Sequence, residues 1–82
     1  MQGMPLHIDT LWFKHRIAES PHGSLSRVAR KMQGRTGRPL EPSMLSLMLR
    51  GKREMRLDEA RQLANLLGVP LIEVLRHVGL PL

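Results

Sequence analysis

The sequence predicts an all-α domain, a compact bundle of about five short helices, and three observations support this prediction. β-Branched residues are scarce, whereas Leu, Met, Ala, Arg and Glu, which favour helices, are abundant. Glycine and proline residues divide the chain into short pieces. In these pieces the apolar residues recur three or four positions apart, which is the spacing of an amphipathic helix. Helices of this kind with short connections would form a single domain over residues 1–82.

The first helix is expected to begin at Asp9 or Thr10, because either residue is a good N-cap. Residues 20–23 contain a proline and a glycine and would end it. The apolar residues expected along its inner side are Leu11, Phe13, Ile17 and Ala18.

A second helix is predicted over residues 24–32, with Ser24 as its N-cap. Its apolar stripe consists of Leu25, Val28, Ala29 and Met32. The basic residues Arg27, Arg30 and Lys31 fall on the other side. Residues 33–41 hold two glycines, two arginines and a proline, a composition that predicts an irregular loop.

A third helix is predicted over residues 42–50. Pro42 suits the first helical position, Glu41 would be the cap, and Gly51 would end the helix. The residues expected to face inward are Met44, Leu45 and Met48.

A fourth helix is predicted from Leu57 to Leu67 and a fifth from Pro70 to about Val78. Asp58 and Glu59 suit the positive N-terminal end of the fourth helix, which Gly68 would terminate. Its buried stripe would be Leu57, Ala60, Leu63, Ala64 and Leu67. The fifth helix would turn Leu71, Val74, Leu75 and Val78 inward.

The positive charge of the chain is concentrated in one segment. Residues 27–56 carry nine Lys or Arg and two acids, a net charge of +7, whereas the remainder carries four Lys or Arg and five acids, a net charge of −1. Concentrated positive charge attracts phosphates, and the release of their counterions drives DNA binding. A solvated basic face without a partner has the same composition, so charge alone leaves both interpretations open.

Other features argue against several classes of protein. Cysteine is absent, which excludes disulfides and thiolate metal sites and suits a cytoplasmic location. The sequence has no signal peptide and no apolar run long enough to span a membrane. The histidines lack metal-ligand spacing, and neither a P-loop nor a catalytic frame occurs. We therefore expect no enzyme activity, cofactor, metal or small-molecule ligand.

Three segments have a familiar order and spacing. Residues 24–32 place a small residue, Ala29, where two helices could cross closely, residues 45–53 end a helix with Gly-Lys-Arg, and residues 57–69 end on Leu-Gly-Val. Together they resemble the Cro/lambda-repressor-like (XRE-type) helix-turn-helix family. This sequence differs from the family in an elongated turn between the two motif helices, in Leu25 where the family often has Gln, and in Leu49 where it often has an acid.

The resemblance implies that the third helix enters the major groove of DNA. By position, the residues that would face the bases are Pro42, Ser43, Ser46 and Leu47. The alternatives are an ordinary solvated helix face for Ser43 and Ser46 and packing inside the protein for Leu47. Serine can hydrogen-bond to any base, so we expect specificity to come from Arg50, from the loop or from DNA shape. The residues expected at phosphates are Lys52, Arg53, Arg56 and Arg27. For Arg35 and Arg38 in the loop, phosphate contact, minor-groove insertion and a plain linker all stay open.

These expectations describe a sequence-specific double-stranded DNA-binding transcriptional regulator of bacterial or phage kind. It would bind as a homodimer, because Ile72, Leu80 and Leu82 are apolar residues that the predicted core does not need. The alternative for Leu80 and Leu82 is that they fold back over the domain's own core. One alternative is an antitoxin or adaptor that mainly binds a protein and binds DNA for autoregulation. The other is an RNA-binding module, against which the low aromatic content argues.

Overall fold

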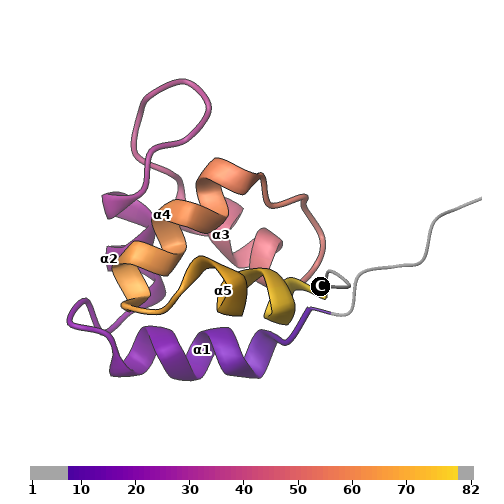
Figure 1. Ribbon diagram of the computed structural model, residues 1–82. Coiled ribbons are helices and arrows are strands. Elements are labelled where there is room, and N and C mark those ends of the chain that lie inside the picture. Colours follow the sequence, from indigo (N-terminus) through magenta and orange to yellow (C-terminus); the bar gives the residue numbers. More distant parts are fainter. Residues whose placement is uncertain (1–7, 80–82) are drawn as a thin grey trace, which may run out of the picture.

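The structure, a computed structural model, describes residues 8–79. These residues form a compact bundle of short helices, which confirms the predicted all-α class (Figure 1). The helices are α1 (Thr10–Glu19), α2 (Leu25–Lys31), α3 (Pro42–Leu49), α4 (Leu57–Leu67) and α5 (Leu71–Val78). The predicted helix ends agree with these bounds to within one residue.

The predicted caps explain where several helices begin and end. The Asp9 side chain accepts a hydrogen bond from the backbone N–H of Trp12 at 3.0 Å, and Ser24 caps α2 through the N–H of Arg27 at 3.3 Å. Glu41 caps α3 with its backbone only, because its side chain makes no capping bond. Gly68 ends α4 in the left-handed conformation, with φ 70°, where glycine carries no side-chain penalty.

Every helix contributes to the core. The buried apolar residues are Phe13, Ile17, Val28, Ala29, Met32, Leu40, Leu45, Met48, Leu49, Ala60, Leu63, Ala64, Leu67, Val74 and Val78. Glu59 is also buried, and its carboxylate accepts the backbone N–H of Arg56 at 2.8 Å. The N-terminal end of α4 is therefore closed by its own third residue.

Three apolar residues expected inside the protein lie at its surface. Leu11 is 76% exposed and Leu57 is 55% exposed, and Ala18 is exposed as well. Leu11 lies two positions before Phe13, which is more than half a helical turn away, so burying Phe13 turns Leu11 outward. Leu57 has the right phase but is the first residue of α4, where the helix extends beyond the core.

The first and last helices of the described chain are joined directly. The backbone N–H of Asp9 donates to the carbonyl oxygen of His77 at 2.8 Å. The Trp12 and His77 rings stack with their centroids 3.7 Å apart and their planes 4° from parallel. As a result α1 lies along α5, and the described chain begins and ends on the same side of the molecule (Figure 1).

The connection between α2 and α3 is more ordered than the predicted irregular loop. Gln33 and Pro39 form an antiparallel bridge, and the N–H of Gly34 donates to the carbonyl oxygen of Arg38 at 2.7 Å. Gly37, with φ 80°, lets the chain reverse at the tip. We call residues 33–39 the hairpin arm, which stands out from the helical body (Figure 1). Leu40 returns the chain to the core, because its side chain is only 6% exposed.

Within residues 8–79, the helices are too short and too polar to cross a membrane.

Candidate nucleic-acid interface

The buried side of α3 fixes which of its side chains face outward. Leu45, Met48 and Leu49 are each at most 2% exposed and hold the helix against the core. The predicted DNA-facing residues lie on the remaining side. Of these, Ser43 and Arg50 are exposed, whereas Pro42, Ser46 and Leu47 are half-buried. The helix therefore presents a mixed polar and apolar surface on its outward side.

A shallow groove of about 230 Å³ runs beside the C-terminal half of α3. It lies between α3, the start of α2 and the side of α1 that carries Thr10 and Lys14. Its lining residues are Thr10, Lys14, Leu25, Ser46, Leu49 and Arg50. The hydroxyl of Thr10 donates to the carbonyl oxygen of Leu49 at 2.6 Å, which holds α1 against the end of α3.

Lys14 is the residue of this groove that sequence reasoning missed. It lies outside the basic segment 27–56 and far from α3 in the sequence. Lys14 lines the same groove as Arg50 because α1 is held against the end of α3. The sequence places Lys14 one helical turn after Thr10, on the same side of α1. That spacing becomes informative only once the contact between Thr10 and the end of α3 is known.

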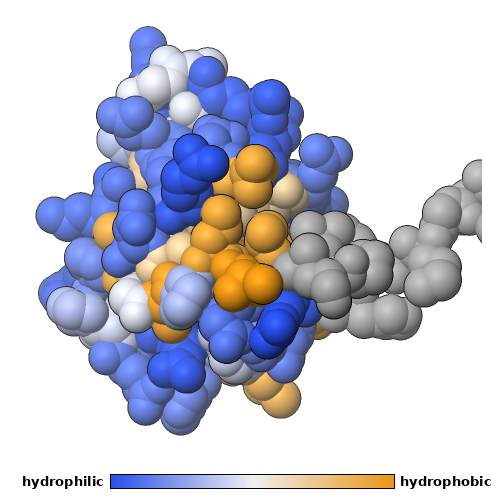
Figure 2. Space-filling model, in the orientation of Figure 1, coloured by the Kyte–Doolittle hydropathy of each residue, from blue (hydrophilic) through white to orange (hydrophobic). Residues whose placement is uncertain are grey.

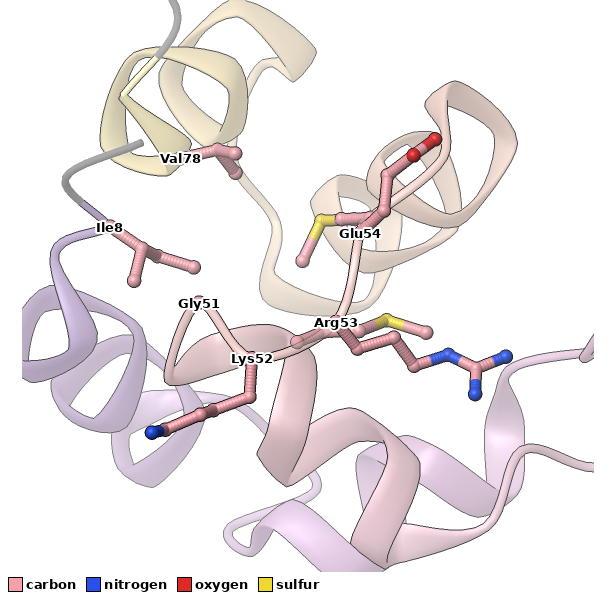
Figure 3. Close-up of a pocket in the computed structure, with 8 residues that line it drawn as sticks. Ile8, Gly51, Lys52, Arg53, Glu54 and Val78 are labelled. Carbon is pink, nitrogen blue, oxygen red and sulfur yellow. The ribbon is translucent and has the colours of Figure 1, made fainter. Parts of the chain in front are cut away.

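The turn after α3 carries two of the predicted phosphate-binding residues. Gly51 adopts φ 73°, as predicted for a residue that ends the helix, and the N–H of Lys52 donates to the carbonyl oxygen of Leu47 at 2.8 Å. Lys52 and Arg53 extend to opposite sides of this turn (Figure 3). Lys52 is exposed, but Arg53 is half-buried and donates from Nη1 to the sulfur of Met44 at 3.0 Å. Arg53 is thus held against α3, and Lys52 is the freer cation.

This turn borders a cleft of about 370 Å³ between α3, the end of α5 and Ile8, which precedes α1 (Figure 3). Its apolar lining comes from Ile8, Met48, Met55 and Val78. The charged residues around it belong to the turn itself, residues 52–54. The cleft therefore offers an apolar surface beside the basic turn rather than a set of converging polar groups.

The other predicted contacts lie around α3 rather than on it. Arg27 is exposed in the first turn of α2, and Arg56 is exposed immediately before α4. Arg35 and Arg38 are exposed in the hairpin arm, which precedes α3. The structure thus places basic side chains before α3, after it and on the neighbouring helix.

The ion pairs of the described residues lie elsewhere. They are Arg16 with Glu19 and two contacts that are ionic only when the histidine is protonated, His15 with Glu19 and His77 with Glu73, all within α1 or within α5. Among residues 8–79, no cation of the basic segment 27–56 is paired with a carboxylate within 4.0 Å. The same residues contain no group of three His, Asp or Glu side chains that could hold a metal ion.

Comparisons with protein-family models, with curated proteins and with solved structures found no match to this chain.

Proposed function

We propose that this protein binds double-stranded DNA in a sequence-specific manner and regulates transcription, with α3 as the recognition helix in the major groove. The observation that carries the proposal is the surface of α3. Its outward side combines hydroxyl, apolar and guanidinium groups from Ser43, Leu47 and Arg50. Exposed basic residues flank the helix in the hairpin arm, in the turn after α3 and on α2.

Each part of this surface would have a distinct task. Ser43, Ser46 and Leu47 would contact base edges, with Leu47 suited to a thymine methyl group. Arg50 is the residue able to form a bidentate contact with guanine. Its Nε donates to the carbonyl oxygen of Ser46 at 3.4 Å, so its side chain lies back along α3 in the free protein and would extend on binding. Lys52, Arg56 and Arg27 would bind phosphates.

We propose that the protein acts as a homodimer, which would read a near-palindromic site with its two recognition helices about 34 Å apart. Ile72, one of the three residues on which this proposal rests, is 48% exposed on α5. The other two, Leu80 and Leu82, lie outside the described residues. Hydrophobic surface also gathers over α4 and α5 (Figure 2). Binding in the reducing interior of a cell would suit a chain without cysteine.

The second candidate function is that of an antitoxin or adaptor whose main partner is a protein. The hydrophobic surface that gathers over α4 and α5 (Figure 2) favours it, because a contiguous apolar patch on a small protein is typical of a contact site. Copurification of a stoichiometric partner, together with weak and sequence-independent DNA binding, would support this function over the first.

The test of DNA binding is a salt titration with duplex libraries. The affinity of the intact chain should fall steeply with salt, with a log–log slope of about −0.9 for each phosphate neutralised. The double variant Lys52→Ala/Arg56→Ala, which removes two exposed cations assigned to phosphates, should reduce the magnitude of that slope by up to about 1.8 and weaken all sequences alike.

The matched control is Arg61→Ala/Arg76→Ala, which removes the same charge from exposed positions of α4 and α5. The slope of the control should stay close to that of the unmodified protein. If the unmodified protein binds no duplex at low salt, or binds equally well at all salt concentrations, the proposed function is wrong.

A further inference from the structure

The hairpin arm is held by a side chain of α4 that has no role in the bundle core. The backbone N–H of Gln33 donates to Oε1 of Gln62 at 2.7 Å, and Nε2 of Gln62 donates back to the carbonyl oxygen of Gln33 at 3.3 Å. The amide of Gln62 therefore pairs with both polar backbone groups of one residue, as an adjacent strand would. This contact ties the arm to a helix that is distant in sequence.

The base of the arm is fixed by two further contacts. The N–H of Leu40 donates to the carbonyl oxygen of Met32 at 2.9 Å, and the Leu40 side chain is inserted in the core. Residue 40 is followed at once by the N-cap of α3. The position of the arm relative to α3 is consequently set by packing and hydrogen bonds rather than by a free linker.

The tip of the arm is strongly cationic. Arg35 and Arg38 are exposed together with the residues between them, and residues 33–40 contain no acid. The N–H of Gly37 donates to the carbonyl oxygen of Gly34 at 3.0 Å, which closes a turn that contains Arg35 and is followed at once by Arg38. Two guanidinium groups are thus displayed on a closed, protruding turn directly before α3.

We propose that the hairpin arm is a preorganised second contact to duplex DNA, in which Arg35 and Arg38 bind backbone phosphates beside the groove that α3 enters, and that Gln62 is its positioning residue. This inference rests on the proposed DNA binding by α3. A guanidinium group matches the geometry of a phosphate and can bind it through two donors. Because the arm is already ordered, binding does not have to order a loop, so less affinity is lost.

The first test removes the cations. Arg35→Ala/Arg38→Ala should weaken duplex binding at ~50 mM salt by roughly tenfold per arginine and reduce the magnitude of the salt slope by up to about 1.8. Its melting temperature should stay unchanged, since both side chains are exposed. The control Arg61→Ala/Arg76→Ala carries the same loss of charge and should keep the affinity and slope of the unmodified protein.

The second test removes the clamp. Gln62→Ala should speed hydrogen exchange at the Gln33 amide, measured by NMR, and weaken duplex binding roughly fivefold, the scale of one net hydrogen bond. In the Arg35→Ala/Arg38→Ala background, Gln62→Ala should have almost no further effect on affinity. A role of Gln62 in stability alone would instead weaken binding equally in both backgrounds.

The outcomes separate this inference from the proposed function. If the intact chain binds duplex DNA while Arg35→Ala/Arg38→Ala keeps its affinity and slope, the arm is only a connection and the inference is wrong. If the loss is confined to A·T-rich sites, the arginines enter the minor groove and the phosphate assignment is overturned. If the intact chain binds no duplex at all, the proposed function is wrong and this inference is wrong with it.

Discussion

Two leucines that are two positions apart on α3 provide the sharpest test of how this helix is oriented. Leu45 is 0% exposed and faces the core, whereas Leu47 is half-buried on the side proposed to face DNA. The single variants Leu45→Ala and Leu47→Ala remove the same atoms. Leu45→Ala should therefore lower stability and leave base preference unchanged, whereas Leu47→Ala should change base preference and leave stability nearly unchanged.

The magnitudes follow from burial. Loss of a fully buried leucine side chain typically costs about 2–5 kcal/mol of unfolding free energy, through lost apolar contact and the cavity left behind. A chain of this size has a net stability of about 4–12 kcal/mol, so Leu45→Ala should lower the melting temperature by roughly 10 °C or more. Leu47→Ala should cost about 1 kcal/mol or less, because part of that side chain is already in water.

The assay pairs thermal unfolding, followed by circular dichroism at 222 nm, with selection of binding sites from a duplex library. Leu47→Ala should keep a melting temperature close to that of the unmodified protein and change which base pairs are preferred, by up to about 3 kcal/mol at a good contact. Leu45→Ala, at a temperature where it is still folded, should prefer the same sites as the unmodified protein. A stable Leu45→Ala with altered base preference would show that the assigned orientation of α3 is wrong.

Two further predictions concern the turns and the oligomeric state. Gly68→Ala should cost about 1–2 kcal/mol of unfolding free energy, because Gly68 has a positive φ with open space around it. Gly51→Ala should cost more, because the methyl group of the new alanine would also lie 3.2 Å from Cγ2 of Ile8. Urea denaturation of both variants measures the difference, and equal costs would contradict the contact with Ile8. The intact chain should be a dimer by light scattering at micromolar concentration, whereas a chain ending at Val78 should be largely monomeric. A monomer both free and on DNA, or an equally strong dimer after truncation, would remove the C-terminal segment from the dimer interface.

Much of the fold could be predicted because its signals are local. Ser24, Asp9 and Gly68 act on residues within one helical turn, so their effect can be recognised from the sequence alone. The stripes of α2 and α4 could be recognised for the same reason. The errors at Leu11 and Leu57 have another origin, since periodicity gives the direction of a side chain but not where the core ends.

The candidate site was less predictable because it depends on contacts between distant segments. The sequence indicates that Arg35 and Arg38 lie in a loop, but the order of that loop depends on Gln62 in α4. In the same way, Lys14 reaches the groove beside α3 only because α1 is docked there. The burial of Leu40 was also missed, because a single leucine between prolines and glycines shows no periodicity.

The stacking of Trp12 on His77 has a consequence for the order in which the chain folds. α1 packs on α2, α2 packs on α3, and α4 packs on α5, and the members of each pair are consecutive in the sequence. Closing α1 onto α5 instead brings together residues from opposite ends of the described chain, and such contacts carry the largest loop-closure entropy. We therefore expect the contact between Trp12 and His77 to form late, after α1 has packed on α2. Substitutions at Trp12 or His77 should consequently raise the rate of unfolding more than they lower the rate of folding, which stopped-flow kinetics would measure.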